Sequence, residues 1–164
     1  MVYEGSYLWQ LRQVVGQQLL LMPGAQVVVV DDRDQVLFQQ RKDSGLWELP
    51  GGAAEPGMSF RETAAQELLE ESGLRVEPVD LVPFGSLSEA ELHTITYPNG
   101  DRLQCYALLF EARQWTGDLV PGADEVIQAR FFEAGEAPEP LQPQTEAVWQ
   151  MYAAYRATGL FQAR

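Results

Sequence analysis

The sequence predicts a mixed α/β domain, in which a mixed β-sheet lies between helices. Strand-like runs stand on both sides of one well-marked helix, and a second amphipathic helix comes near the end of the chain. This order favours a sheet with a helix on each face. The 164 residues suffice for one hydrophobic core, so we expect a single domain over residues 1–164.

The composition disfavours several classes of protein. Aspartate and glutamate number 24 against 11 lysines and arginines, which gives a formal net charge of −13. General nucleic-acid binding and binding to anionic membranes are disfavoured because both need a cationic surface. The only cysteine is Cys105, so a disulfide scaffold is excluded. The sequence shows neither a membrane-length apolar run nor a secretory signal near Met1, and we expect a cytoplasmic protein.

The N-terminal segment, residues 1–24, is expected to be extended. Residues 8–21 suggest one or two short strands with a turn at Gly16. Pro23-Gly24 is a typical chain break, and we expect these strands to end there.

Two further strands are predicted directly afterwards. Residues 26–30 form a β-branched run typical of a buried strand, and residues 35–40 resume an alternating pattern. The aspartate-rich segment 31–34 has turn chemistry, so we expect the two runs to form a hairpin.

The clearest local signal is a helix. Ser59 is a suitable N-cap, and Glu62 three residues later completes a capping box. We therefore predict a helix over residues 60–72, with Gly73 in the left-handed conformation that commonly ends helices.

The remaining strands and the closing helix are predicted from periodicity and turn residues. Strand candidates occupy residues 76–86, 92–97, 103–111 and 126–132. Residues 98–101 (Pro-Asn-Gly-Asp) are a strong turn signal between the second and third of these. Apolar residues at helical spacing predict a closing helix within residues 143–159.

Three glutamates on the first predicted helix indicate chemistry. Glu67, Glu70 and Glu71 fall within a stripe about 100° wide. Like charges at this spacing repel, and the negative end of the helix dipole adds to the cost. A bound Mg²⁺ or Mn²⁺ would relieve this conflict, since both prefer oxygen ligands. A solvated acidic face is the alternative interpretation.

The loop before this helix suits a ligand site. Gly51-Gly52 allows the backbone to approach a ligand closely, and its carbonyl groups can point at a metal ion. The loop runs through Glu55 directly into the helix.

From Leu49 to Leu74 the sequence resembles the signature box of the Nudix hydrolases. The family pattern has a glycine, five residues, a glutamate, seven residues, and then Arg-Glu-apolar, one residue, Glu-Glu, one residue and Gly-apolar. The spacing matches over 23 residues, with identity at Gly52, Glu67, Glu70, Glu71 and Gly73. The strand pair, Arg41 and Trp47 extend the resemblance, which covers most of the chain from about Leu19. It implies a Nudix-type α/β/α sandwich.

Two positions depart from the pattern. Met58 stands in place of the first glutamate and Gln66 in place of the arginine. Since these two residues generally pair in the family, losing both avoids leaving one charge without its partner. We expect Met58 to pack and Gln66 to hydrogen-bond loop carbonyls, while the metal-binding glutamates stay intact.

The resemblance implies hydrolysis of a pyrophosphate linkage in a nucleoside diphosphate derivative, such as ADP-ribose or a nucleotide sugar. The implied Mg²⁺ (or Mn²⁺) ligands are Glu67, Glu70, Glu71 and the Gly51 carbonyl. The general base would be Glu125, on a loop before a late strand, or Glu67 itself. Arg41 and Gly52 are candidates for binding the substrate, although Arg41 could equally be a strand-end surface residue.

Two other readings stay open. Met58 and Gln66 could mark a catalytically weakened Nudix domain that binds nucleotide and metal as a sensor or scaffold. The chain could also be a plain acidic structural domain. Homodimers are common in the family, and the N-terminal strands are candidate contact elements.

Three further residues are expected to be structural, with exposure as the alternative for His93 and stacking on a nucleobase as the alternative for Trp47. His93 is the only histidine and lies in an alternating stretch, Cys105 lies in an apolar run, and Trp47 precedes the glycine loop. A lone histidine or cysteine in such a setting usually packs rather than reacts.

Overall fold

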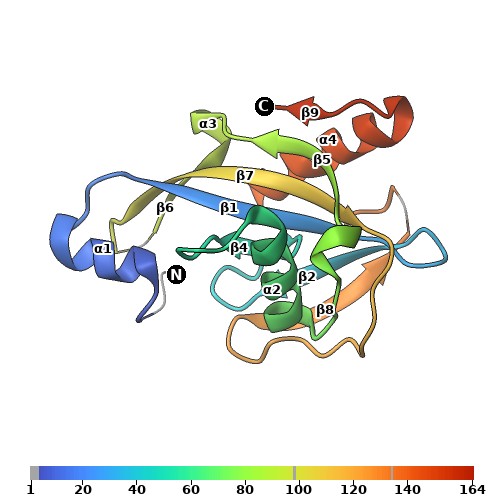
Figure 1. Cartoon of the computed structure of the whole chain (residues 1–164), viewed down its shortest axis with the longest axis horizontal. Coiled ribbons are helices and arrows are strands. Elements are labelled where there is room, and N and C mark those ends of the chain that lie inside the picture. The colour runs from blue at the N-terminus through green and yellow to red at the C-terminus, as the bar shows by residue number, and fades with distance from the viewer. Residues whose placement is uncertain (1–3, 98, 134) are drawn as a thin grey trace.

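Two β-sheets and two packed helices form the scaffold of the computed structural model, which describes residues 4–97, 99–133 and 135–164 (Figure 1). The larger sheet has the order β4-β1-β7-β5-β9, with β6 also paired to β7. Its strands are β1 (Leu20–Val29), β4 (Gly51–Ala53), β5 (Val82–Leu87), β6 (Thr94–Thr96), β7 (Arg102–Ala112) and β9 (Gln162–Ala163). The smaller sheet has the order β3-β2-β8, from β2 (Val36–Arg41), β3 (Trp47–Glu48) and β8 (Val126–Phe132).

The central strand β1 organises both halves of the core. It pairs parallel with β7 from Leu20↔Leu103 to Val29↔Ala112. Because side chains alternate along a strand, Val27 and Val29 enter one apolar cluster while Val28 and Val30 enter the other. The parallel central pair with antiparallel neighbours confirms the predicted mixed sheet.

One helix covers each face of this sheet (Figure 1). Helix α2 (Phe60–Ser72) packs Ala64 and Leu68 into the first cluster. Helix α4 (Pro143–Thr158) packs Val148 and Met151 into the second. The predicted α/β/α sandwich is therefore confirmed.

The prediction of N-terminal strands over residues 1–24 is wrong. Helix α1 spans Tyr7–Val15. Of the described residues 4–24, only the last five, residues 20–24, belong to β1. Ser6 caps the helix by accepting a hydrogen bond from the Trp9 N–H at 3.2 Å. Leu8 and Arg12, one helical turn apart, are both buried. Because Arg12 lies on the buried face, the apolar residues alone do not show the helical period, and the sequence pattern does not indicate a helix.

The predicted break at Pro23-Gly24 is also wrong, since both residues lie inside β1. The Pro23 carbonyl accepts a hydrogen bond from the Ala54 N–H at 2.9 Å. A Cβ at Gly24 would come within 2.5 Å of the Gly52 carbonyl oxygen. The glycine therefore permits a close crossing with the β4 backbone instead of ending the strand.

The predicted hairpin between residues 26–30 and 35–40 is correct only at its turn. The Asp31 N–H donates to the Gln35 carbonyl at 3.0 Å, and Val30 bridges Val36. Beyond that bridge β1 and β2 enter different sheets. The side chains of both runs are buried on both faces of their strands, so other elements must pack against each face of each strand.

The other predictions hold in part. Helix α2 has the expected bounds and capping box, and Gly73 has a φ of 76°. The predicted strand over residues 76–86 is shortened by a 3₁₀ turn (Pro78–Asp80), and that over 92–97 is shortened by helix α3 (Ala90–His93). The antiparallel pairing of β6 with β7 confirms the hairpin there, although Pro98 of its turn lies outside the described residues. No helix in the described ranges is long and apolar enough to cross a bilayer.

Replacing Leu68 tests the contact between α2 and the sheet. Leu68 has no solvent exposure, so we expect Leu68→Ala to lower the free energy of unfolding by about 2–5 kcal/mol in urea denaturation. Val79→Ala, at a position 82% exposed, is the control and should change it by less than about 0.5 kcal/mol. Equal effects of the two variants would contradict this packing.

Candidate active site

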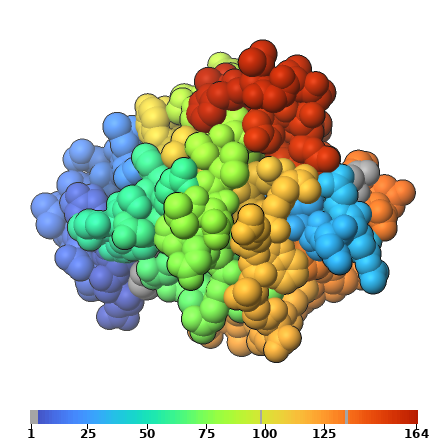
Figure 2. Space-filling model, turned by 45° about the vertical axis from the view of Figure 1, so that its right-hand side comes forward, coloured from blue at the N-terminus to red at the C-terminus, as the bar shows by residue number. Residues whose placement is uncertain are grey.

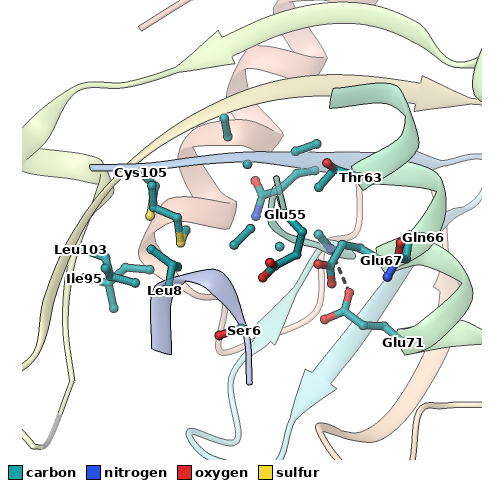
Figure 3. A pocket seen from close by; sticks show the side chains of 18 of the residues that line it. Ser6, Leu8, Glu55, Thr63, Gln66, Glu67, Glu71, Ile95, Leu103 and Cys105 are labelled. Atoms are coloured by element: carbon teal, nitrogen blue, oxygen red, sulfur yellow. Dashed lines mark hydrogen bonds between the residues drawn. The ribbon is translucent and has the colours of Figure 1, made fainter. Parts of the chain in front are cut away.

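A cavity of about 190 Å³ opens between α2, the glycine loop, α1 and the β6–β7 hairpin (Figure 3). One part of its wall is strongly acidic, and Arg41 is the only lysine or arginine among the described residues that line it. The acidic residues lining it are Glu48, Glu55, Glu67, Glu70, Glu71 and Glu125. The structure thus gathers the three predicted helix glutamates, Glu125, Arg41 and Gly51-Gly52 around one cavity.

Glu67 projects from α2 into this cavity (Figure 3). Burial raises the pKa of Glu67 to about 7, and the negative charges of Glu70 and Glu125 contribute to the rise. The Glu67 carboxyl group therefore keeps its proton up to about neutral pH, where a glutamate in water is ionised. A cation at this point would offset the same repulsion.

Glu71 lies deeper on the same helix. Only 6% of Glu71 is exposed, and its carboxylate accepts a hydrogen bond from the Gly51 N–H at 2.9 Å. Burial, with the charges of Glu48 and Glu67, raises the pKa of Glu71 well above its usual value. This bond ties the glycine loop to the helix that carries the acids.

The two loop positions, Gly51 and Gly52, leave no room for a side chain. A Cβ at Gly52 would overlap the Glu67 carboxylate, and a Cβ at Gly51 would overlap the Ala25 carbonyl of β1. The loop is therefore pressed between β1 and α2, where a larger residue would displace either the strand or the acid.

Gln66 and Met58 occupy the two positions that depart from the family pattern. Gln66 Nε2 donates to Glu70 Oε1 at 2.7 Å, so the expected bonds to loop carbonyls are replaced by a bond to a candidate metal ligand. Met58 lines the cavity and is partly buried. The brace between loop and helix comes instead from Glu71 and Gly51.

Arg41 stands at the edge of the site with its guanidinium already paired. It contacts Glu48 at 2.9 Å and Asp43 at 2.7 Å. These two carboxylates raise the pKa of Arg41 above its usual value. Sequence reasoning missed Glu48, although its place directly before Leu49-Pro50 is a signal that could have found it.

Glu125 lies exposed at the rim of the cavity, on the loop before β8. Its backbone carbonyl accepts a hydrogen bond from the Lys42 N–H at 2.9 Å. This bond attaches the loop to the end of β2 and keeps the Glu125 carboxylate close enough to influence Glu67.

The residues expected to be structural are buried, although His93 ends helix α3 instead of lying in the predicted strand. Trp47 is buried and packs edge-to-face on Phe132, with ring centroids 5.1 Å apart. His93 and Cys105 are buried, and both also line the cavity. His93 Nδ1 lies 3.1 Å from the Leu87 carbonyl oxygen.

The donor set fits a hard divalent cation. Glu67, Glu70 and Glu71 offer carboxylate oxygens on one helix. Burial raises the pKa values of Glu67 and Glu71, so their ionised forms are unfavourable without a cation. Among the described residues, no three acidic, histidine or cysteine side chains already converge as a finished metal centre. Glu70 is held by Gln66 and Glu71 by Gly51, so cation binding would need these side chains to turn toward one another.

A family model described as the NUDIX domain matches residues 20–155. The chain belongs to the Nudix family. The match includes the glycine loop and α2, and it begins after α1. Nudix hydrolases generally use a divalent metal such as Mg²⁺ and act on small nucleotide substrates.

Relatives and solved structures agree with this membership. An 8-oxo-dGDP phosphatase of Mus musculus is 32% identical over 121 residues, covering 70% of this chain and 33% of that protein. A Bacillus subtilis protein provisionally named ADP-ribose pyrophosphatase is 31% identical over 118 residues, covering 72% of this chain and 53% of that protein. The matches thus span about a third to a half of these relatives.

The fold is similar to that of a NUDIX hydrolase from Nitrosomonas europaea. The two structures superpose with a TM-score of 0.65 at 22% identity, over 87% of this Nudix chain and 77% of the other. At this level of identity the likeness concerns the fold.

The raised pKa of Glu67 predicts that the metal-free protein loses stability as pH rises. The unfolded chain releases this proton near its ordinary value of 4.5 and the folded chain near about 7. The folded state therefore binds more protons in that window, and stability should fall across it by about 3 kcal/mol for this group. Urea denaturation between pH 5 and 8 in a chelator measures the fall.

Glu67→Gln should reduce this fall, whereas Glu91→Gln, at an exposed position, should leave it unchanged. Added Mg²⁺ should also reduce it, because the cation favours the ionised carboxylates. A fall of the same size in Glu67→Gln and in the unaltered protein would contradict this assignment.

Proposed function

We propose that this Nudix protein is a Mg²⁺-dependent pyrophosphohydrolase that cleaves the pyrophosphate linkage of a nucleoside diphosphate derivative. The observation that carries the proposal is the pair of buried carboxylates, Glu67 and Glu71, held against the Gly51-Gly52 loop. Buried acids with raised pKa values at the wall of a cavity are more typical of a functional site than of a solvated face.

Glu67, Glu70, Glu71 and the Gly51 carbonyl would hold the cation. When bound, Mg²⁺ neutralises charge on the diphosphate and acidifies a coordinated water. Mn²⁺ has similar ligand preferences and could replace it. The cation also explains how a chain with a net charge of −13 accepts a polyanion.

The chain's own residues would then position and deprotonate the attacking water. Its oxygen bonds to one phosphorus, the bond from that phosphorus to the bridging oxygen breaks, and Glu125 or Glu67 accepts the proton. Arg41 would contact a phosphate from the cavity edge. Gly52, lacking a side chain, would let the substrate approach the loop backbone.

ADP-ribose or a nucleotide sugar is the proposed substrate class. In support, the two relatives are named for 8-oxo-dGDP and ADP-ribose, both of which contain a diphosphate joined to a nucleoside. A screen of nucleoside diphosphate sugars, dinucleotides and nucleoside triphosphates with Mg²⁺, with products identified by mass spectrometry, tests the class directly. No release of monophosphate from any of them would contradict the proposal.

A second candidate function is a nucleotide- and metal-binding sensor or scaffold with little turnover. The observation that favours it is the hydrogen bond from Gln66 to Glu70, which occupies a candidate metal ligand. Binding of Mg²⁺ and nucleotide without release of product would distinguish the sensor from the hydrolase.

Neutralising the helix acids one at a time tests the metal assignment. Glu70→Gln and Glu71→Gln should each lower kcat by about a hundredfold or more, because each removes a charged ligand of the cation that would neutralise the transition state. Glu91→Gln is the matched control, and its kcat should stay unchanged. Near-normal turnover in both site variants, with the fold confirmed by circular dichroism, would defeat the assignment.

Restoring the usual pair of the family tests the meaning of the two departures. Met58→Glu combined with Gln66→Arg should keep or raise kcat, because the new arginine pairs with the new glutamate and frees Glu70 from Gln66. The double variant is compared with each single variant in the same hydrolysis assay. If the double variant unfolds, the account of a simple neutral replacement is wrong.

A further inference from the structure

The loop between β7 and β8, residues 113–125, packs against the C-terminal end of helix α2. The Val120 N–H donates to the Ser72 carbonyl and the Gly122 N–H donates to the Glu71 carbonyl, each at 2.8 Å. The last carbonyl groups of a helix have no partner within the helix, so the loop supplies donors that the helix lacks. In the space-filling view the loop, in amber, lies beside the green segment at the end of α2 (Figure 2).

Gly122 fits this contact because it has no side chain. A Cβ at this position would overlap the Glu70 backbone carbonyl oxygen and lie 3.2 Å from the Glu71 Cα. Both are main-chain atoms of α2, which cannot turn aside as the end of a flexible side chain can. The loop is therefore in direct backbone contact with the helix that carries the candidate metal ligands.

Lys42 attaches the same loop to the end of β2. Its ammonium group donates to the Ala123 carbonyl, and its backbone N–H donates to the Glu125 carbonyl at 2.9 Å. The backbone bond does not depend on the side chain, whereas the ammonium bond does. One residue thus makes two bonds to the short segment that ends at Glu125.

A β-bulge determines which residue lies opposite Lys42. The register between β2 and β8 shifts after Gln40, so that Arg41 lies opposite Val126. The shift brings Glu125, the preceding residue, opposite Lys42. Bulges of this kind are common beside active sites, where they redirect a side chain.

These contacts fix Glu125 at the rim of the cavity. The Val126 N–H donates to the Gly122 carbonyl at 3.0 Å and closes the turn that precedes β8. Glu125 is exposed and lines the cavity together with Glu67. An exposed carboxylate on a loosely held loop would sample many positions, because nothing would offset the conformational entropy of the chain.

We propose that Lys42 and Gly122 are positioning residues for hydrolysis, which hold the β7–β8 loop so that the Glu125 carboxylate reaches the attacking water. Neither is among the described residues that line the cavity, so both would act through Glu125. The inference rests on the proposed function and deepens it, because it names what places one of the candidate bases.

The required precision gives the expected size of the effect. A general base must lie within hydrogen-bond reach of the water that it deprotonates, and a displacement of about 1 Å costs up to about a hundredfold in rate. Lys42→Met removes the ammonium group and keeps the aliphatic chain and the backbone bond. It should therefore loosen the loop without unfolding β2.

Hydrogen–deuterium exchange of the full chain tests the attachment without any substrate. Lys42→Met should raise the exchange rates of the Gly122 and Val126 amides by about fivefold, the effect of one lost hydrogen bond. The amides in the middle of α2 should stay unchanged. Lys42→Arg retains a cationic donor and should exchange like the unaltered protein. Unchanged loop exchange in Lys42→Met would overturn the proposal.

Steady-state hydrolysis with Mg²⁺ tests the positioning, using ADP-ribose or another nucleoside diphosphate derivative that the screen shows to be cleaved. Lys42→Met should lower kcat by about tenfold and change KM by less than about twofold, whereas Lys42→Arg should restore most of kcat. Arg33→Met removes the same charge at an exposed position before β2 and should change neither value. Equal losses in Lys42→Met and Arg33→Met would show an effect of net charge and contradict the proposal.

Gly122→Ala displaces the loop from the opposite side and should also lower kcat by about tenfold, with the fold checked by circular dichroism. In a Glu125→Gln background neither Gly122→Ala nor Lys42→Met should lower kcat further, because both act through that carboxylate. Additive losses in that background would contradict the positioning role.

Calorimetry with Mg²⁺ alone distinguishes this role from a general effect on α2. The Mg²⁺ affinity of Lys42→Met should stay within about twofold of that of the unaltered protein, and a larger loss would contradict the proposal. Full turnover in Lys42→Met would refute the positioning role and leave the hydrolase standing. A protein that shows the exchange difference and hydrolyses none of the screened compounds would refute the hydrolase and leave Lys42 as a structural anchor of the loop.

Discussion

The burial of two carboxylates, Glu67 and Glu71, against the glycine loop is the constraint on which this site depends. Each acid would be more stable ionised in water, and the fold keeps both where burial and like charges oppose ionisation. The Gly51 N–H bond to Glu71 and the missing side chain at Gly52 make the arrangement possible. A cation bound between the two carboxylates would relieve this electrostatic conflict.

The surrounding elements show how the scaffold sustains this conflict. Helix α2 is anchored by Leu68 and Ala64 to the sheet, while its acids face the cavity. A helix packed in this way cannot rotate to expose its glutamates without losing its buried contacts. Arg41 forms an ion pair with Glu48 at the cavity edge, which places a guanidinium group next to an otherwise acidic wall.

Helix α1 changes the character of the cavity. Leu8 of α1 lines the cavity together with Ile95 of β6 and with Leu103 and Cys105 of β7. The helix is attached to the glycine loop through the hydrogen bonds from the Tyr7 N–H to the Glu55 carboxylate.

The sequence by itself determined the family, the capped helix over residues 60–72 and the set of acids on it, because capping, periodicity and spacing are local properties. It also determined the α/β/α layering and the buried, structural settings of Trp47 and Cys105. Residues 7–15 form a helix that Ser6 caps locally, but only the tertiary structure supplies the carbonyl groups of Gln18 and Arg102 that let Arg12 lie on its buried face. It also decided that Pro23-Gly24 continue a strand, that β1 and β2 part into two sheets, and that Gln66 bonds to Glu70. Each of these depends on a partner distant in sequence or on a choice among several nearby ones, and no local pattern specifies that partner.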